Sequence, residues 1–177
     1  GRSCVLQASP DPCWDDVVRP RSSSLFTQLS GPEGMRQVWT TFGPDQVDVD
    51  WRSPEVLLGF TRLMAQMMRH GVRWLRLDAV GFVWKTPYTS CIHLSQAHRI
   101  VEVLRHLLEA TCSEGVVVTE TNVPEEENLS YLRSGREAHL AYNFPLPPLL
   151  LEAAISGRAD LLNRWLCRWP QLPEQTG

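Results

Sequence analysis

Paired cysteines, long apolar runs and a recognisable secretory signal are all lacking in this sequence of 177 residues. No stretch approaches the roughly 18 consecutive apolar residues of a membrane-spanning helix, so an integral membrane protein is not indicated. The five cysteines are far apart and none belongs to a CxxC pair. This spacing argues against a zinc cluster and a disulfide framework, and it favours a reducing compartment, so we expect a cytoplasmic protein.

An excess of charge of one sign is also missing, because 20 acidic side chains stand against 17 basic ones and give a net charge of -3. Such a chain offers no broad basic surface, so neither nucleic acid nor an anionic membrane is an expected partner. What the sequence does contain is a hydrophobic fraction of 43%, which is typical of a domain that buries a core. Function must therefore be sought in local motifs.

Residues 1–50 carry five prolines and a run of three serines, and we interpret this segment as mostly loop. The only strands that the pattern permits there are short ones at residues 24–28 and 37–41. Because so long a loop-rich stretch is unusual within a compact domain, it indicates a functional insertion, a lid, or the edge of a larger unit.

From residue 51 onward, apolar residues change between helical and strand spacing. The pattern predicts helices at residues 54–70, 95–110, 125–134, 145–155 and 159–169, and strands at residues 73–79, 116–120 and 138–144. Helices that alternate with strands in this order indicate an α/β fold, whose parallel strands are joined by right-handed crossovers.

The first two helices have clear boundary signals. Ser53 and Ser95 are suitable N-cap residues, and Gly71 is suited to end the first helix. Apolar side chains at helical spacing predict that the first helix turns one stripe inward, which comprises Val56, Leu57, Phe60, Leu63, Met64, Met67 and Met68.

Charged residues stand at the carboxyl ends of two successive predicted strands, where parallel α/β folds place their sites. Arg76 and Asp78 share one face of the first strand, while Leu75 and Leu77 point towards the covering helices. Glu120 ends the second strand. Since neighbouring parallel strands lie about 4.8 Å apart, the two carboxylates can approach the roughly 5–5.5 Å of a retaining glycosidase pair.

This pair suits glycosyl transfer. One acid would stay ionised as the nucleophile, and the other would be held protonated, because the neighbouring charge and partial burial raise its pKa. Arg76 would keep Asp78 ionised and oriented. Two simpler interpretations stay open: a buried Arg76–Asp78 ion pair without catalytic use, and a Glu120 that caps the next helix. The histidines show no ligand spacing, so no metal site is expected.

Residues 71–80 read GVRWLRLDAV, residues 118–120 read VTE and residues 46–50 read QVDVD. The first two resemble the segments of the α-amylase superfamily (glycoside hydrolase family 13) that carry the nucleophilic aspartate and the acid/base glutamate. The third is similar to the QPDLN segment near the end of the family's inserted B domain, with Val47 in place of proline and Asp50 in place of asparagine.

Four other stretches resemble the sucrose phosphorylase subfamily, namely residues 38–46, 78–85, 89–94 and 143–148. The resemblance as a whole spans roughly residues 17–155. Within this subfamily, TETNVPEEEN at residues 119–128 is closer to the glucosylglycerate phosphorylase type. Sucrose phosphorylases tend to carry a histidine where Asn122 stands, which argues against sucrose as the substrate.

The resemblance implies a (β/α)8 TIM barrel that acts on a small α-glucoside by double displacement. Asp78 would attack the anomeric carbon while Glu120 protonates the leaving oxygen, and inorganic phosphate would then take the glucosyl group. No cofactor is implied. Phe82 and Asn122 would line the sugar or acceptor site, with simple packing behind the strand as the alternative for Phe82. Asp48 would be either a site residue or a loop-stabilising acceptor.

Two segments of the family pattern are not found: an earlier Asn-His segment, and a later His-Asp segment that supplies the third catalytic acid. We therefore interpret residues 1–50 as the end of a B-domain-like insertion, and residues 51–177 as central βα units of an incomplete catalytic barrel. Little activity is expected from this chain alone. The alternatives are a hydrolase or transglycosylase of the same superfamily, and a degenerate fragment without catalysis.

Overall fold

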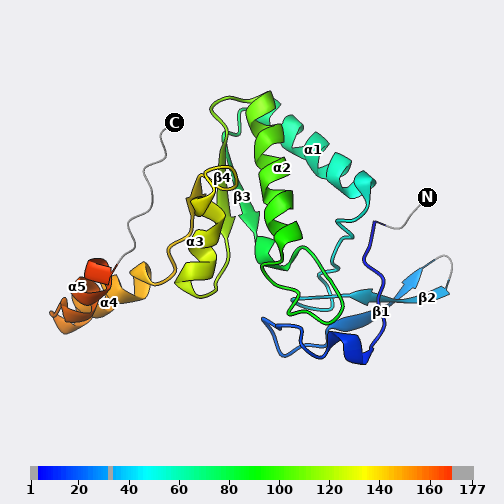
Figure 1. Ribbon diagram of the computed structural model, residues 1–177, viewed down its shortest axis with the longest axis horizontal. Helices are drawn as coiled ribbons and strands as arrows, with labels where there is room; N and C mark the ends of the chain where they lie inside the picture. The colour runs from blue at the N-terminus through cyan, green and yellow to red at the C-terminus, as the bar shows by residue number, and fades with distance from the viewer. Residues whose placement is uncertain (1–3, 32–33, 169–177) are drawn as a thin grey trace.

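An antiparallel hairpin and a three-stranded parallel sheet organise the chain, of which the computed structural model describes residues 4–31 and 34–168. The hairpin pairs β1 (Phe26–Gly31) with β2 (Gly34–Trp39). The parallel sheet has the order β3 (Trp74–Asp78), β4 (Val116–Glu120) and β5 (Leu140–Ala141). Figure 1 shows the hairpin and the parallel sheet as separate parts of the molecule.

Helices separate the parallel strands along the chain. Helix α1 (Pro54–Arg69) precedes β3, α2 (Ser95–Thr111) lies between β3 and β4, and α3 (Glu125–Arg133) lies between β4 and β5. A short 3-10 helix, η2 (Val80–Phe82), directly follows the turn after β3. The predicted alternation of helices with parallel strands is confirmed.

One face of the parallel sheet is covered by helices and the other is open. Leu75 of β3 is buried in the core, whereas Trp74 points the other way and is 63% exposed. The buried core residues on the covered side are Met64, Met68, Leu75, Val80, Val101, Leu104, Leu108, Val117, Tyr131 and Ala138. This confirms the predicted division of β3, with Leu75 towards the helices and Arg76 on the open face.

Only part of the apolar stripe on α1 is covered. Its buried residues are Val56, Met64 and Met68, and its exposed ones are Phe60, Leu63 and Met67. Helix α1 packs against α2, which covers one side of the stripe. On the other side Trp51 stacks on Phe60 with 4.6 Å between ring centroids but leaves the ring partly exposed. The prediction of an inward stripe is therefore wrong for its exposed half.

Residues 4–50 combine long loops with a few short regular elements. Besides the hairpin, this segment contains the 3-10 helix η1 (Pro12–Trp14) and two isolated bridges, Val5 to Val49 and Gln7 to Val38. The buried side chains Leu6, Leu25, Trp39 and Cys91 form a second small core. The interpretation as mostly loop holds, since β1, β2 and η1 take only 15 of the described residues 4–31 and 34–50. The loops are nevertheless packed, because thinly spread apolar residues converge on Trp39, which is fully buried.

Two boundary predictions are also wrong. Ser95 is not the N-cap of α2 but its first residue, and the cap position is held by Leu94 without a side-chain bond. The strand predicted at residues 138–144 is reduced to β5. The side-chain oxygen of Asn143 accepts a hydrogen bond of 3.1 Å from the N–H of Leu146, so the chain already turns there into the next helix.

The last two helices, α4 (Leu146–Ser156) and α5 (Asp160–Arg168), pack on each other and lie apart from the parallel sheet (Figure 1). Neither helix has a buried side chain. Large apolar side chains stay exposed on them, namely Leu150, Leu151, Ile155, Leu161 and Leu166. Within residues 4–31 and 34–168, every helix is too short or too polar to cross a lipid bilayer.

Candidate active site

Asp78 and Glu120 end adjacent parallel strands at the same level. The register of β3 and β4 places Asp78 opposite Glu120, and the N–H of Ala79 donates to the Glu120 carbonyl at 2.9 Å. One nitrogen of Arg76, Nη2, lies 3.3 Å from Asp78 Oδ1 and 3.4 Å from Glu120 Oε2. The structure thus brings together the three side chains that the sequence suggested for catalysis.

The two carboxyl groups have different surroundings. The side chain of Asp78 is 68% exposed and that of Glu120 is 20% exposed. A hydrogen bond with the Asp78 carboxyl raises the pKa of Glu120, and burial and the charge of Asp78 raise it further, while the Ala79 N–H and Arg76 act in the opposite direction. Glu120 is therefore suited to hold a proton beside the more exposed Asp78.

Arg76 also contacts an aromatic ring that sequence reasoning did not single out. Its guanidinium carbon lies 5.4 Å from the ring centroid of Tyr142, a cation–π distance. The carbonyl of Tyr142 accepts a hydrogen bond of 2.8 Å from the side-chain amide of Asn128, whose oxygen accepts one of 2.8 Å from the Thr121 hydroxyl. The buried Asn128 therefore links the loop after β4 to the end of β5.

The turn after β3 is tight and leaves no room for a side chain at Gly81. Ala79 has a left-handed φ of 51°, and a Cβ placed on buried Gly81 would lie 2.7 Å from Cε1 of His93. The N–H of His93 donates to the Gly81 carbonyl at 2.9 Å. This tight turn brings Phe82 beside the carboxyl pair.

The two acids open onto a cleft of about 490 Å³, within the usual range of small-molecule sites. It is lined by Pro20, Arg21, Phe42, Gln46, Asp78, Ala79, Phe82, Glu120, Thr121 and Asn122. The ring of Phe82 meets that of Phe42 edge-on, with 5.4 Å between centroids. Phe82 and Asn122 therefore both lie at the cleft, and Phe82 also packs.

Asp48 uses both of its oxygens within the protein. Oδ1 accepts the N–H of Thr41 at 3.0 Å, and Oδ2 accepts the Thr41 hydroxyl at 2.7 Å. Oδ2 also pairs with Lys85 Nζ at 3.0 Å. These contacts are those of a loop-stabilising acceptor. Lys85 was not predicted; a single cation inside the apolar stretch Phe82-Val-Trp-Lys85 is the signal that could have revealed it.

The ionisable side chains of the cleft are few. Arg21 lines it together with Asp78 and Glu120, and Arg76 contacts both acids. Among the described side chains, no group of three or more His, Cys, Asp or Glu residues is arranged to hold a metal ion. The described arrangement therefore offers two carboxyl groups beside an arginine, and a pair of carboxyl groups is what acid-assisted displacement at a sugar carbon requires.

Proteins of known function resemble this sequence over most of its length, although no family model matches it. A glucosylglycerate phosphorylase of Allomeiothermus silvanus is 47% identical over 161 residues, which cover 90% of this chain and 29% of that protein. A glucosylglycerate phosphorylase of Escherichia coli is 43% identical over 162 residues, again 90% of this chain and 29% of that protein. The chain thus spans less than a third of the length of these curated relatives.

Among solved structures, the fold matches sucrose 6F-phosphate phosphorylase from Thermoanaerobacter thermosaccharolyticum with a TM-score of 0.79. The match covers 93% of this chain and 36% of that one, at 21% sequence identity. This likeness confirms the expected fold, a part of a (β/α)8 barrel. The identity to the two bacterial relatives shows that the chain belongs, as a fragment, to the sucrose and glucosylglycerate phosphorylase-like branch of glycoside hydrolase family 13.

Proposed function

We propose that the protein to which this chain belongs is a retaining glycoside phosphorylase, which cleaves an α-glucoside of the glucosylglycerate type with inorganic phosphate. The carrying observation is the Asp78–Glu120 pair, which stands in register on adjacent strands and shares one nitrogen of Arg76. The identity of 47% and 43% to two glucosylglycerate phosphorylases supports the choice of substrate.

The proposed reaction has two displacements at the anomeric carbon. In the first, the Asp78 carboxylate attacks this carbon while Glu120 gives its proton to the glycosidic oxygen, so glycerate leaves and a glucosyl–Asp78 ester forms. In the second, a phosphate oxygen attacks the same carbon, Glu120 takes up the proton that this oxygen loses, and Asp78 is released. Two inversions give α-glucose 1-phosphate with retained configuration.

The described geometry suits these roles. Arg76 contacts both acids through one nitrogen, and the raised pKa of Glu120 keeps its proton available for the leaving oxygen. Asp78 is the more exposed of the two, as a nucleophile that must reach the sugar carbon has to be.

The leaving group and the attacking group of this reaction are both anions, since glycerate carries a carboxylate. Arg21 lines the cleft beside the two acids, and a guanidinium matches carboxylate and phosphate oxygens with paired hydrogen bonds. Asn122 adds an exposed amide at the same cleft, and Phe82 adds an apolar wall for the sugar. We assign Arg21 and Asn122 to the acceptor side.

In this proposal the activity belongs to a longer protein, because the chain matches 29% of each relative. Residues 1–50 would end a B-domain-like insertion, and residues 51–177 would supply the central βα units of the barrel. The remaining units would bring the third catalytic acid. All five cysteines are free thiols, which supports work in the reducing cytoplasm.

The experiment is to incubate the full-length protein with glucosylglycerate, with and without phosphate, and to measure glucose and glucose 1-phosphate. Glucose 1-phosphate that forms only with phosphate supports the proposal. Glucose released without phosphate would identify a hydrolase, and new glucosides would identify a transglycosylase. No turnover of any α-glucoside would indicate a degenerate relative.

A further inference from the structure

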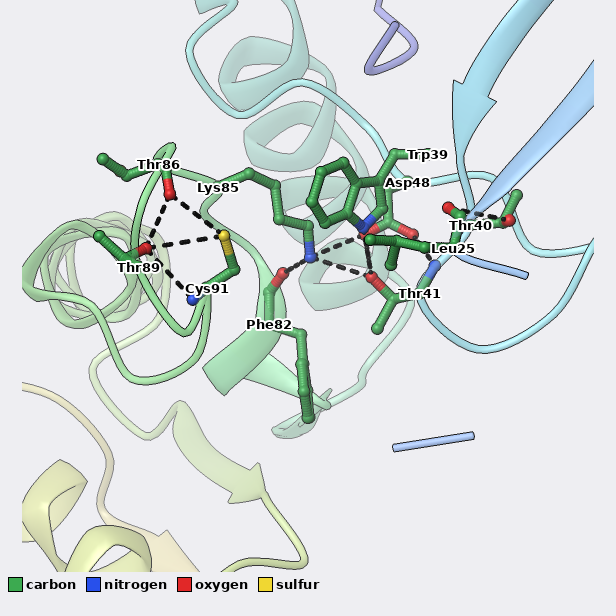
Figure 2. Close-up of polar contacts among 10 residues, drawn as sticks. All are labelled: Leu25, Trp39, Thr40, Thr41, Asp48, Phe82, Lys85, Thr86, Thr89 and Cys91. Carbon is green, nitrogen blue, oxygen red and sulfur yellow. Dashed lines mark hydrogen bonds and ion pairs between the residues drawn. The ribbon is translucent and has the colours of Figure 1, made fainter. Parts of the chain in front are cut away.

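Lys85 is the only lysine in the sequence, where all the other basic residues are arginines. Its side chain is 4% exposed. Figure 2 shows its ammonium group between the turn after β3 and the end of the hairpin. There it donates to the carbonyl oxygen of Phe82 and, at 3.0 Å, to the Thr41 hydroxyl, and it pairs with Asp48 Oδ2 at 3.0 Å. All three ammonium hydrogens thus have an acceptor.

This arrangement selects a compact cation. An ammonium group can donate in three directions from one atom, whereas the planar guanidinium of arginine is wider and donates in its plane. The ammonium also lies 5.2 Å from the ring centroid of Trp39. Burial lowers the pKa of Lys85, and the charge of Asp48 opposes this shift. A buried ion pair of this kind contributes little net stability, so its use is more specific than holding the fold.

The segment that follows the hairpin is held together by hydrogen bonds that do not involve Lys85. Thr41 and Asp48 are joined by two hydrogen bonds, the indole N–H of Trp39 donates to the Thr41 hydroxyl at 3.0 Å, and the N–H of Asp48 donates to the Trp39 carbonyl at 2.9 Å. What Lys85 adds is a link from this closed unit to the backbone of Phe82.

That link bears directly on the cleft. Phe42 follows Thr41 in the chain, and its ring packs edge-on against Phe82, whose carbonyl Lys85 holds. Both rings line the cleft with Asp78 and Glu120. We propose that Lys85 is a positioning residue, which fixes the Phe42–Phe82 wall next to the catalytic carboxyls and thereby sets the affinity for the glucoside. The identity of that glucoside rests on the function proposed above.

The test separates positioning from stability by two variants of the full-length protein. Lys85→Met removes the link but leaves the Asp48 carboxylate without its cation, so a fall in Tm is expected. Lys85→Met/Asp48→Asn removes both charges and should regain most of that Tm. If Lys85 positions the wall, KM for the glucoside stays about tenfold above wild type in the double variant, while kcat changes less.

Hydrogen–deuterium exchange of peptides from residues 79–86 gives a readout that needs no substrate. Faster exchange there in the double variant, with residues 37–48 still protected, is the expected result. A double variant that regains wild-type KM together with Tm, or that exchanges like wild type at residues 79–86, would overturn the proposal. Lys85→Arg, which keeps the positive charge, is the control. Its KM should lie between that of wild type and that of the double variant.

The outcome stays separate from that of the proposed function. Turnover of an aryl α-glucoside measures KM without phosphate, so the comparison of variants remains decisive even if the wild-type protein forms no glucose 1-phosphate. If no glucoside is turned over, hydrogen–deuterium exchange alone decides, and unchanged exchange rejects the role of Lys85.

Discussion

His93 and Tyr131 share a hydrogen bond of 2.9 Å between imidazole Nδ1 and phenol oxygen, next to the turn that follows Asp78. The imidazole fills the space above Gly81, and its other nitrogen lies 3.6 Å from the Glu127 carboxylate. Tyr131 is fully buried. The His93 imidazole, a group that can gain a proton, therefore packs against the backbone of the turn that carries the candidate site.

Stability should fall in mild acid because of His93. Burial lowers the pKa of His93 below its ordinary value of 6.5, although the charge of Glu127 opposes the shift. Below pH 6.5 the unfolded chain binds a proton that the folded chain still excludes, so the free energy of unfolding decreases as pH falls from 6.5 towards the folded-state pKa. Urea unfolding between pH 8 and pH 5 measures it.

The variant His93→Asn should flatten this pH dependence, and asparagine tolerates the left-handed φ of 51° at this position. His139, whose pKa is also lowered by burial, should preserve a smaller slope of the same sign. His106→Asn, on the exposed side of α2, is the matched control. An equal slope in wild type and His93→Asn would contradict the assignment.

Gly81→Ala should destabilise the fold by about 1–3 kcal/mol, because the added methyl group meets the His93 ring in a packed turn. Gly59→Ala is the comparison. No atom lies within 4 Å of a Cβ at that exposed helical position, so it should stabilise the fold by about 1 kcal/mol. Denaturant midpoints of both variants decide, and a neutral Gly81→Ala would show that the His93 ring moves aside freely.

Asp78→Asn in the full-length protein should lower kcat by about 10⁴-fold or more, since no ester can form on the amide. Glu120→Gln should cost about 10²–10⁴-fold with a poor leaving group and much less with an aryl leaving group, which needs no proton. Steady-state rates on both substrate types measure this contrast. Equal losses for both substrates in Glu120→Gln would argue against an acid/base role.

The 177-residue chain alone should show no measurable turnover and should bind a dye such as ANS. Its parallel sheet has one open face with Trp74, and large apolar side chains stay exposed on α1, α4 and α5. Exposed apolar area of this kind favours association. Strong dye fluorescence and concentration-dependent size in ultracentrifugation are expected. Turnover of an α-glucoside by the isolated chain would contradict this.

Secondary structure was predicted best where the apolar residues follow a single spacing, either that of a helix or that of a strand. The strand Val116–Glu120 and the helix that begins at Pro54 were placed correctly, because apolar spacing and terminal signals agree there. The register sets Asp78 opposite Glu120, as expected for two acids that each end one of two neighbouring parallel strands. For the same reason the geometry of the acid pair could be foreseen.

What could not be foreseen depends on contacts between segments distant in sequence. The role of Lys85 arises from Thr41 and Asp48, 44 and 37 residues earlier; the apolar stretch around Lys85 could mark a buried cation but could not identify these partners. Likewise, the packing of Trp39 gathers thinly spread apolar residues into the second core. Phe60 and Leu63 were expected inside because helical spacing reports an apolar face without reporting what covers it.

The single lysine has a practical consequence. A protease that cuts only after lysine finds one peptide bond in this chain, between Lys85 and Thr86, and the folded protein keeps that lysine side chain out of solvent. Cleavage into two pieces therefore reports opening of this one junction, so its rate measures how often the hairpin and the turn after β3 come apart.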